Sequence, residues 1–190
     1  MNLPNKLTVA RIILVPFCMF FIAFTGMNDT AARIIALVLF SLTSLTDMLD
    51  GKIARKYNLI TDFGKFLDPV ADKVLVFAAL IAFTELGFAS SVAVVIMMAR
   101  EFLVSSMRMV AASKGKVIAA GKSGKVKTAV TMVSIVVILL MMALGDFGLT
   151  AVSFALPVVS NVLIWICGVL TVYSGAEYLI KNKDVFTGSM

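Results

Sequence analysis

Histidine is absent from the 190 residues, and cysteine occurs only twice. The lack of histidine removes the commonest general base in enzymes and the imidazole ligands of zinc and iron sites. Cys18 and Cys167 each lie inside an apolar run without metal-ligand spacing, so we expect packed, reduced thiols and no disulfide framework. Any acid–base or metal chemistry must therefore use carboxylates.

Charged residues are also scarce, at 15% of the chain, whereas 61% is apolar and the mean hydropathy is +1.03. This balance lies far from that of a soluble globular domain and predicts an integral membrane protein. The net charge is +6, but the lysines and arginines occur in short pieces between apolar runs. We interpret them as topology signals and contacts with anionic lipids, not as a nucleic-acid interface.

Several apolar segments are long enough to span a membrane, which takes about 20 residues each. We expect an all-α fold of six helices with short connections, forming a single membrane-embedded domain over residues 1–190 without internal repeats. The first segment follows Lys6 and could imitate a signal peptide, but it lacks a small-residue cleavage site, so we expect a retained helix. The predicted helices cover residues 7–26, 31–54, 69–88, 90–112, 126–145 and 153–179.

Lysine and arginine are distributed unevenly among the predicted connections. The 55–66 and 113–125 connections and both termini are basic, whereas the opposite side offers only Arg33. Because cytoplasmic loops retain lysine and arginine, this asymmetry predicts that both termini face the cytoplasm and that the number of spans is even.

Four aspartates stand close together near the predicted ends of two helices. Asp47 and Asp50 are three residues apart and Asp68 and Asp72 are four apart, so each pair lies on one face of a helix. Like charges at the edge of hydrocarbon repel one another unless they are protonated or bind cations. Oxygen ligands favour hard ions such as Mg²⁺, Mn²⁺ or Ca²⁺, and Mg²⁺ commonly pairs carboxylates with substrate phosphates. The spacing therefore predicts a divalent-metal site that binds a phosphorylated substrate.

Small and basic residues accompany the aspartates. Gly51 and Ala54 leave room for a substrate group to approach the helix backbone, and Arg55 can offer a planar fork to a diphosphate. Gly64 allows a turn, and Pro69 suits the first turn of the following helix. The alternative is that the aspartates are caps and solvated loop charges, which does not explain all of these spacings together.

In this region the chain resembles the CDP-alcohol phosphotransferase family, whose signature is D-x2-D-G-x2-A-R-x8-G-x3-D-x3-D. Every position of that signature is present between Asp47 and Asp72. The resemblance implies a six-helix membrane fold, usually a homodimer, with a cavity that opens to the cytoplasmic leaflet. It also implies transfer of a phosphatidyl group from a CDP-activated lipid to an alcohol, with release of CMP.

The resemblance further implies roles for the signature residues. Asp47, Asp50 and Asp68 would ligate two divalent ions, Mg²⁺ or Mn²⁺. Asp72, at the edge of this centre, would remove the proton of the acceptor hydroxyl. The residues implied to bind the CDP lipid are Asp47, Asp50, Gly51, Ala54, Arg55 and Gly64. Thr61 is a further candidate for the nucleotide, although turn chemistry explains it equally well.

Within the family, other segments are most similar to members that join CDP-diacylglycerol to glycerol 3-phosphate and form phosphatidylglycerophosphate. These segments are Asn2 to Arg11, Asp68 to Lys73, Arg100 to Phe102 and Gly124 to Thr128. A phosphorylated acceptor needs cations outside the metal site, and helix N-termini also favour anions. The candidates for the acceptor phosphate are Thr8, Arg11, Arg108, Lys125 and Lys127, with membrane anchoring as the alternative.

Arg100 and Glu101 lie deep in the predicted fourth helix, where unpaired charge is costly. Adjacent residues on a helix point in different directions, so we expect each to find a partner on another helix.

Two alternatives stay open. The acceptor could be another alcohol, such as inositol phosphate or serine. From a different class, a divalent-cation or proton-coupled transporter could use the same aspartates. A transporter is disfavoured because the aspartates cluster near the cytoplasmic ends of two helices, without a matching acidic set on the outer side. We therefore expect a phosphatidyltransferase of the cell membrane, a homodimer whose site faces the cytoplasm.

Overall fold

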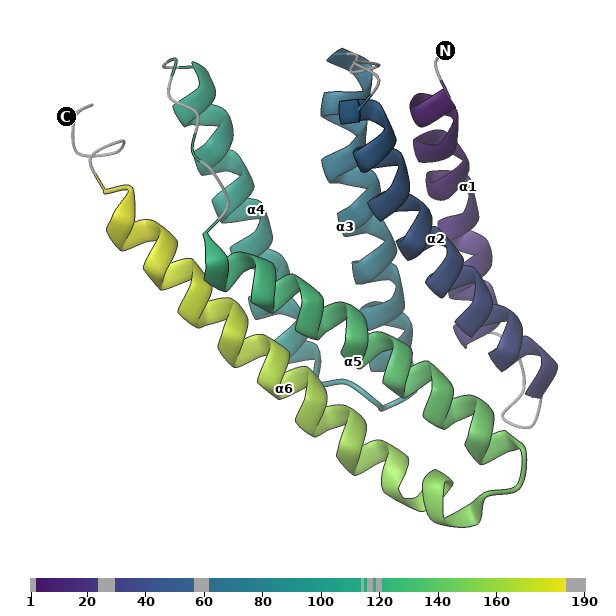
Figure 1. Ribbon diagram of the computed structural model, residues 1–190. Coiled ribbons are helices and arrows are strands. Elements are labelled where there is room, and N and C mark those ends of the chain that lie inside the picture. Colours follow the sequence, from purple (N-terminus) through teal and green to yellow (C-terminus); the bar gives the residue numbers. More distant parts are fainter. Residues whose placement is uncertain are drawn as a thin grey trace.

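The computed structural model describes residues 3–23, 30–56, 62–113, 115, 118 and 121–183, and the side chains of residues 3–5 and 47–66 lie outside the described set. The described residues form six α-helices and no strand (Figure 1). The helices are α1 (Leu3–Ala23), α2 (Thr30–Lys56), α3 (Asp62–Glu85), α4 (Ser91–Ser113), α5 (Lys122–Asp146) and α6 (Thr150–Lys181). The prediction of an all-α fold is confirmed, and each helix overlaps one predicted apolar segment.

The largest difference from the predicted boundaries is at the start of α3. We expected a connection through residue 66, with Gly64 in a turn and Pro69 in the first helical turn. Instead α3 begins at Asp62 and contains both residues, so that expectation is wrong. Pro69 removes one backbone hydrogen bond from the helix interior, but the helical spacing of apolar residues before it favours an earlier start. Those residues are Phe63, Phe66 and Leu67.

The chain reverses direction at each connection, so α1 begins and α6 ends at the same end of the bundle (Figure 1). The C-terminal ends of α2 and α4 lie at this end too. Both ends of the described chain, with Lys6 and Lys181, therefore share the side that the charge distribution predicts to be cytoplasmic.

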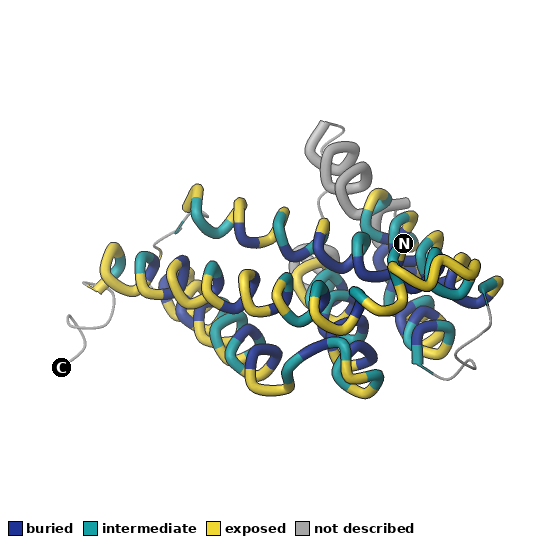
Figure 2. The backbone as a smooth tube through the Cα atoms, turned by 90° about the horizontal axis from the view of Figure 1, so that it is seen from below, coloured by how far each residue is buried: buried dark blue, intermediate teal, exposed yellow. Residues whose placement is uncertain are grey.

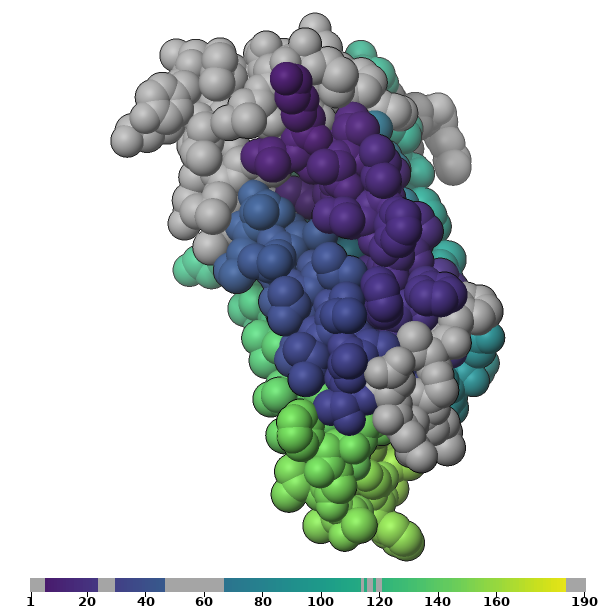
Figure 3. All heavy atoms as spheres, turned by 90° about the vertical axis from the view of Figure 1, so that its right-hand side faces the viewer, coloured from purple at the N-terminus to yellow at the C-terminus, as the bar shows by residue number. Residues whose placement is uncertain are grey.

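The helices pack mainly as neighbouring pairs: α1 with α2 and α3, α5 with α2 and α6, and α4 with α6. Figure 3 shows α1 and α2 side by side on one face, with the turn between α5 and α6 beyond them. Gly148 in that turn has φ = +96°, a conformation that residues with a side chain rarely adopt. The pairing of α3 with α4 is sparse by comparison, which leaves space between these two helices.

All six helices contribute apolar side chains to one buried core. Close van der Waals packing of such side chains holds helices together in an apolar surrounding. Figure 2 shows the buried positions on the helix faces that meet and the exposed positions on the outer faces. Cys18 and Cys167 belong to the core as free, buried thiols, as expected. Its largest members include Phe40, Phe83, Met97, Ile138 and Ile164.

The outer surface is apolar to an extent that suits lipid rather than water. Phe154 is 92% exposed and Val169 is 65% exposed, and soluble proteins avoid extended surfaces of this kind. Within the described residues, three segments are long and apolar enough to cross a membrane: Lys6–Ala23, Lys122–Asp146 and Thr150–Lys181. Helix α2 adds a shorter apolar stretch, Thr30–Thr46. The protein is therefore a helical membrane protein.

Arg33 links three helices at the end of the bundle opposite the termini. It lies at the end opposite the basic connections, as the charge distribution predicts, and it is only 3% exposed. Its Nε lies 3.4 Å from a carboxylate oxygen of Asp146, and its Nη1 donates a hydrogen bond to the backbone carbonyl of Ile22. A single side chain thus joins α2 to the ends of α1 and α5.

Candidate active site

Asp68 and Asp72 lie on one face of α3, near the end of the bundle that holds the termini. Asp68 is exposed, and its Oδ1 accepts a hydrogen bond of 2.6 Å from the hydroxyl of Thr8 on α1. Thr8 is only 1% exposed, and Arg11, one turn further along α1, is 2% exposed. These two acceptor candidates therefore lie inside the bundle, with Thr8 against Asp68.

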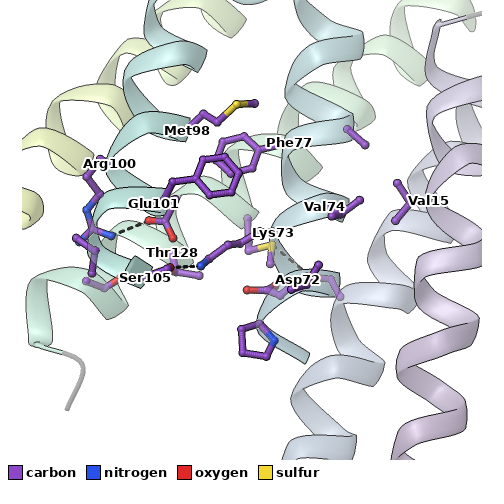
Figure 4. Close-up of a pocket in the computed structure, with 18 of the residues that line it drawn as sticks. Val15, Asp72, Lys73, Val74, Phe77, Met98, Arg100, Glu101, Ser105 and Thr128 are labelled. Carbon is purple, nitrogen blue, oxygen red and sulfur yellow. Dashed lines mark hydrogen bonds and ion pairs between the residues drawn. The ribbon is translucent and has the colours of Figure 1, made fainter. Parts of the chain in front are cut away.

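Asp72 is half-buried and lines a large cavity between the helices. The next residue, Lys73, crosses the space between α3 and α4, and its Nζ donates a hydrogen bond to Oγ of Ser105 (Figure 4). The pair bridges two helices that otherwise have few close contacts. The carboxylate of Asp72 and the ammonium of Lys73 thus belong to the same cavity.

The cavity has a volume of about 1970 Å³ and is lined by residues from α1 to α5. Part of its wall is polar, with charged groups from α3, α4 and α5. The rest is apolar, and Val15, Val74 and Phe77 mark this part in Figure 4. Some of the residues that line the cavity are also exposed on the outer surface, namely Val74, Ile81 and Phe102. The cavity is therefore open rather than enclosed. Such a cavity can take a ligand with a charged head and apolar chains.

A network of charged side chains joins α4, α5 and α6 beside the cavity. Glu101 accepts hydrogen bonds at Oε1 from Lys127 on α5 and from Nη1 of Arg100, the latter at 2.7 Å. Nη2 of Arg100 lies 3.0 Å from Oγ of Ser174 on α6. The expectation that Arg100 and Glu101 pair with other helices is confirmed. The two residues also contact each other, because their long side chains bend together from adjacent positions.

Gly175 on α6 leaves room for Arg100. A Cβ atom built on Gly175 would lie 2.9 Å from Cγ of Arg100. A side chain at this position would therefore displace Arg100 from the path to Ser174.

Two further cations of the candidate acceptor set line the large cavity. Arg108 is exposed, and its guanidinium carbon lies 5.5 Å from the ring centre of Tyr178 on α6. Lys125 is also exposed. Lys127, in contrast, is 6% exposed and paired with Glu101. Of the five acceptor candidates, Arg108 and Lys125 therefore line the cavity, and Lys127 lies beside it. Thr8 and Arg11 are not among the residues that line it.

Other predicted site residues fall partly or wholly outside the described set. Five of them lie in the final turns of α2, where the backbone is helical and the side chains are not described: Asp47, Asp50, Gly51, Ala54 and Arg55. Gly64 lies in the first turn of α3, and Thr61 lies outside the described residues. Because α2 remains helical through Lys56, the spacing of Asp47, Asp50 and Ala54 does place them on one helix face.

The donor groups of α3 suit a hard divalent ion. Oδ1 of Asp68 is occupied by Thr8, which leaves Oδ2 for another ligand, and Asp72 follows one turn later. Both offer only oxygen atoms, the ligands that Mg²⁺ and Mn²⁺ prefer. Among the described residues no three acidic, cysteine or histidine side chains form a metal site. Asp47 and Asp50, which would complete the set, have undescribed side chains.

Sequence reasoning did not assign roles to Lys73 and Ser105, although both line the cavity. The signal for Lys73 was present, since a lysine inside an apolar helix calls for a nearby partner or ligand. Ser105 had no such signal, because serine is common in membrane helices and its contact with α3 depends on the tertiary fold.

Comparisons with known proteins identify relatives along nearly the whole chain. Residues 1–173 match the family model described as CDP-alcohol phosphatidyltransferase. A Bacillus subtilis protein named CDP-diacylglycerol--glycerol-3-phosphate 3-phosphatidyltransferase is 39% identical, with 99% of this chain and 98% of the relative covered. A Rickettsia felis protein of the same name is 37% identical, with 97% of both chains covered. A Mycobacterium tuberculosis protein named probable phosphatidylglycerophosphate synthase is 36% identical, with 95% of this chain and 81% of the relative covered.

Proposed function

Because the chain belongs to the CDP-alcohol phosphatidyltransferase family, we propose that it transfers the phosphatidyl group of CDP-diacylglycerol to glycerol 3-phosphate. The products are phosphatidylglycerophosphate and CMP. The observation that carries the proposal is similarity along nearly the whole chain to relatives named for this reaction. The sequence-based resemblance to that group of the family is thereby confirmed.

The cavity supports the same function. A CDP lipid has a charged head and apolar chains, and the cavity joins a charged wall to an open apolar one. Asp72 lines the charged part, and the other signature aspartates precede it in α2 and α3. In this proposal the diphosphate lies at the aspartates, while the acyl chains follow the exposed apolar residues of α3 and α4.

The aspartates divide the chemistry between them. Asp47, Asp50 and Asp68 would hold divalent ions, with Asp72 beside them. Gly51, Ala54, Arg55 and Gly64 would contact the CDP group, and Thr61 would lie close to the nucleotide. When bound, Mg²⁺ or Mn²⁺ ions, two in the proposal, supply positive charge that neutralises the diphosphate and the leaving CMP.

Asp72 acts as the general base. Its carboxylate takes the proton of the acceptor hydroxyl, and the oxygen attacks the phosphorus that carries diacylglycerol. A bond forms between this oxygen and phosphorus, the bond from phosphorus to the CMP oxygen breaks, and CMP leaves with the electron pair. Direct transfer of this kind requires no protein nucleophile.

The cations on the other side of the cavity favour a phosphorylated acceptor. Arg108 and Lys125 line the cavity, and Lys127 is held beside it by Glu101. A dianionic phosphate gains charge-assisted hydrogen bonds from such groups, whereas serine offers a smaller negative charge. Inositol phosphate meets the same electrostatic requirement. We propose glycerol 3-phosphate because the relatives are named for phosphatidylglycerophosphate synthesis.

The wider arrangement belongs to the same proposal. Residues 1–190 form one domain whose six helices all cross the cell membrane, with both termini and the active site on the cytoplasmic side, and two copies form a homodimer. The shared end of α1 and α6 and the basic residues near it support this orientation. Single-cysteine variants at the two ends of the bundle, labelled from either side of sealed vesicles, test it.

The reaction is tested with purified protein, CDP-diacylglycerol, glycerol 3-phosphate and Mg²⁺ or Mn²⁺. We expect release of CMP that depends on the acceptor, and formation of phosphatidylglycerophosphate. Asp72→Asn should remove turnover while CDP-lipid binding is largely kept. The matched control is Glu85→Gln, which changes a carboxylate at the far end of the same helix.

Inositol phosphate and serine serve as alternative acceptors in the same assay. Preference for one of them would replace glycerol 3-phosphate in the proposal. Absence of turnover with every alcohol, together with metal flux into protein-containing vesicles, would favour a transporter instead. Full activity of Asp72→Asn would show that another group is the base.

A further inference from the structure

Lys73 occupies a central place in the cavity that the proposed reaction has not yet used. It follows Asp72 directly on α3, is half-buried and lines the cavity. Its side chain points away from the α1 side, where Thr8 binds Asp68, and reaches Ser105 on α4 (Figure 4). The ammonium group thus stands on the side of the cavity where the acceptor cations lie.

The partner of Lys73 is neutral, unlike those of the neighbouring cations. Lys127 and Arg100 both pair with Glu101, and Arg108 lies over the aromatic ring of Tyr178. Within the part of the chain that the structure describes, Lys73 forms no ion pair, and its hydrogen bond goes to a hydroxyl group. A charged ammonium in an apolar helix is costly to keep without an ion-pair partner. The position therefore suits an anionic ligand.

The surroundings of Lys73 define where that anion would lie. On α4, Ser105 and Arg108 are three residues apart and share a face, and both line the cavity. Asp72, Glu101 and Arg108 line the same cavity as Lys73, and Lys127 pairs with Glu101. Arg100, which pairs with Glu101, adds a further cation beside this wall. Positive groups therefore exceed negative ones on this side, which favours an incoming phosphate.

We propose that Lys73 binds the phosphate group of the acceptor together with Arg108, while Asp72 faces the acceptor's hydroxyl group. Ser105 holds the ammonium extended across the cavity before the acceptor arrives. Because Asp72 and Lys73 are consecutive residues, one turn of α3 would fix both ends of a short phosphorylated alcohol. This inference rests on the proposed function and adds a substrate-binding residue to it.

The arrangement explains why the acceptor and the lipid need not compete for the same cations. In the proposed function the lipid diphosphate would lie at the signature aspartates, whereas Lys73 extends toward α4. A neutral side chain at position 73 should therefore affect the acceptor and leave the lipid largely unaffected. That selectivity separates substrate binding from a purely structural role in joining α3 to α4.

The test is steady-state kinetics of Lys73→Met, Lys73→Arg and Ser105→Ala, with each substrate varied while the other is saturating. We expect Lys73→Met to raise KM for glycerol 3-phosphate about tenfold or more, the effect of losing one charge-assisted hydrogen bond. KM for CDP-diacylglycerol should stay within about twofold. Lys73→Arg keeps the charge and should recover part of the loss, and Ser105→Ala should show a smaller effect than Lys73→Met. Lys122→Met, at the exposed start of α5, is the matched control and should behave as wild type.

A binding measurement accompanies the kinetics in case turnover is too low to analyse. Inorganic phosphate and glycerol 3-phosphate should each raise the unfolding temperature of the wild-type protein, and Lys73→Met should lose this shift without a lower unfolding temperature in buffer. An unchanged KM for glycerol 3-phosphate with a retained shift overturns the proposal. A rise confined to KM for CDP-diacylglycerol also overturns it and assigns Lys73 to the lipid. Wild-type protein without turnover on glycerol 3-phosphate contradicts the proposed function, and the phosphate shift then still decides whether Lys73 is an anion site.

Discussion

The hydroxyl of Thr8 donates a hydrogen bond of 2.6 Å to Asp68 across a sequence separation of 60 residues. Thr8 is buried and Asp68 is exposed, so the bond lies at the edge of the packed bundle, and it joins α1 to the start of the aspartate-bearing face of α3. A carboxylate with one oxygen fixed in this way keeps the other oxygen in a defined direction. Groups that orient metal ligands commonly affect metal affinity although they do not touch the ion.

Thr8→Val is therefore expected to weaken divalent-metal binding by about tenfold or more. Valine has nearly the same shape as threonine but lacks the hydroxyl that Asp68 accepts. The Mn²⁺ concentration that gives half-maximal CMP release should rise, and direct titration of the protein with Mn²⁺ should show the same change. Thr8→Ser keeps the hydroxyl and is the control. Equal affinities in Thr8→Val and wild type would leave the bond with a packing role only.

Glu101→Gln should destabilise the protein, because Glu101 is the shared carboxylate for Lys127 and Arg100. Its side chain is 18% exposed and that of Lys127 is 8% exposed, so water replaces the lost charge poorly. Removal of one partner from a largely buried pair costs about 3 kcal/mol. Thermal unfolding in detergent measures the change.

Glu177→Gln provides the control for that experiment. Glu177 also pairs with a lysine, Lys181, but the lysine side chain is 68% exposed. Exposed pairs contribute little to stability, so the unfolding temperature should barely change. Similar losses in both variants would show that burial does not set the strength of the Glu101 network.

Gly175→Ala should displace the side chain of Arg100. The new Cβ would lie 2.9 Å from Cγ of Arg100, which is closer than such atoms normally approach. We expect a loss of about 1–3 kcal/mol and a broken hydrogen bond from Arg100 to Ser174. Gly168→Ala is the control on the same helix, since its Cβ would meet Ala93 at an ordinary 3.8 Å. Alanine there should be neutral or stabilising because it favours helix.

Chelation should stop the reaction if carboxylates hold the ions that the proposed chemistry requires. Excess EDTA is expected to abolish CMP release, and added Mn²⁺ or Mg²⁺ should restore it. Asp68→Asn should require more metal for the same rate, because the amide is a weaker ligand than the carboxylate. Turnover that persists after thorough chelation would rule out metal-dependent transfer.

The fold could largely be predicted because apolar runs determine where membrane helices form. Prediction was least accurate at the start of α3, where proline at position 69 suggested a boundary but the helix begins at Asp62. Proline disfavours the helix interior only by an amount that surrounding interactions can offset. The pattern of apolar residues before it was the better guide.

Contacts between distant segments could not be predicted in the same way. Spacing within one helix indicated that Asp68 and Asp72 share a face, but nothing local connects Thr8 with Asp68 or Lys73 with Ser105. Lys127 shows the same limit: its charge suggested a role in binding phosphate, whereas its pairing with Glu101 depends on how α4 and α5 pack. Local patterns gave candidate residues, and the tertiary fold determined their partners.

The open apolar side of the cavity, with Val74, Ile81 and Phe102, has a consequence for how the rate must be expressed. A lipid that approaches there diffuses in two dimensions, while the acceptor arrives from bulk water. The quantity that governs saturation is then the mole fraction of CDP-diacylglycerol in the bilayer or micelle, not its amount per litre. Adding inert detergent at constant total lipid should slow the enzyme by surface dilution, although every molar concentration of substrate stays the same.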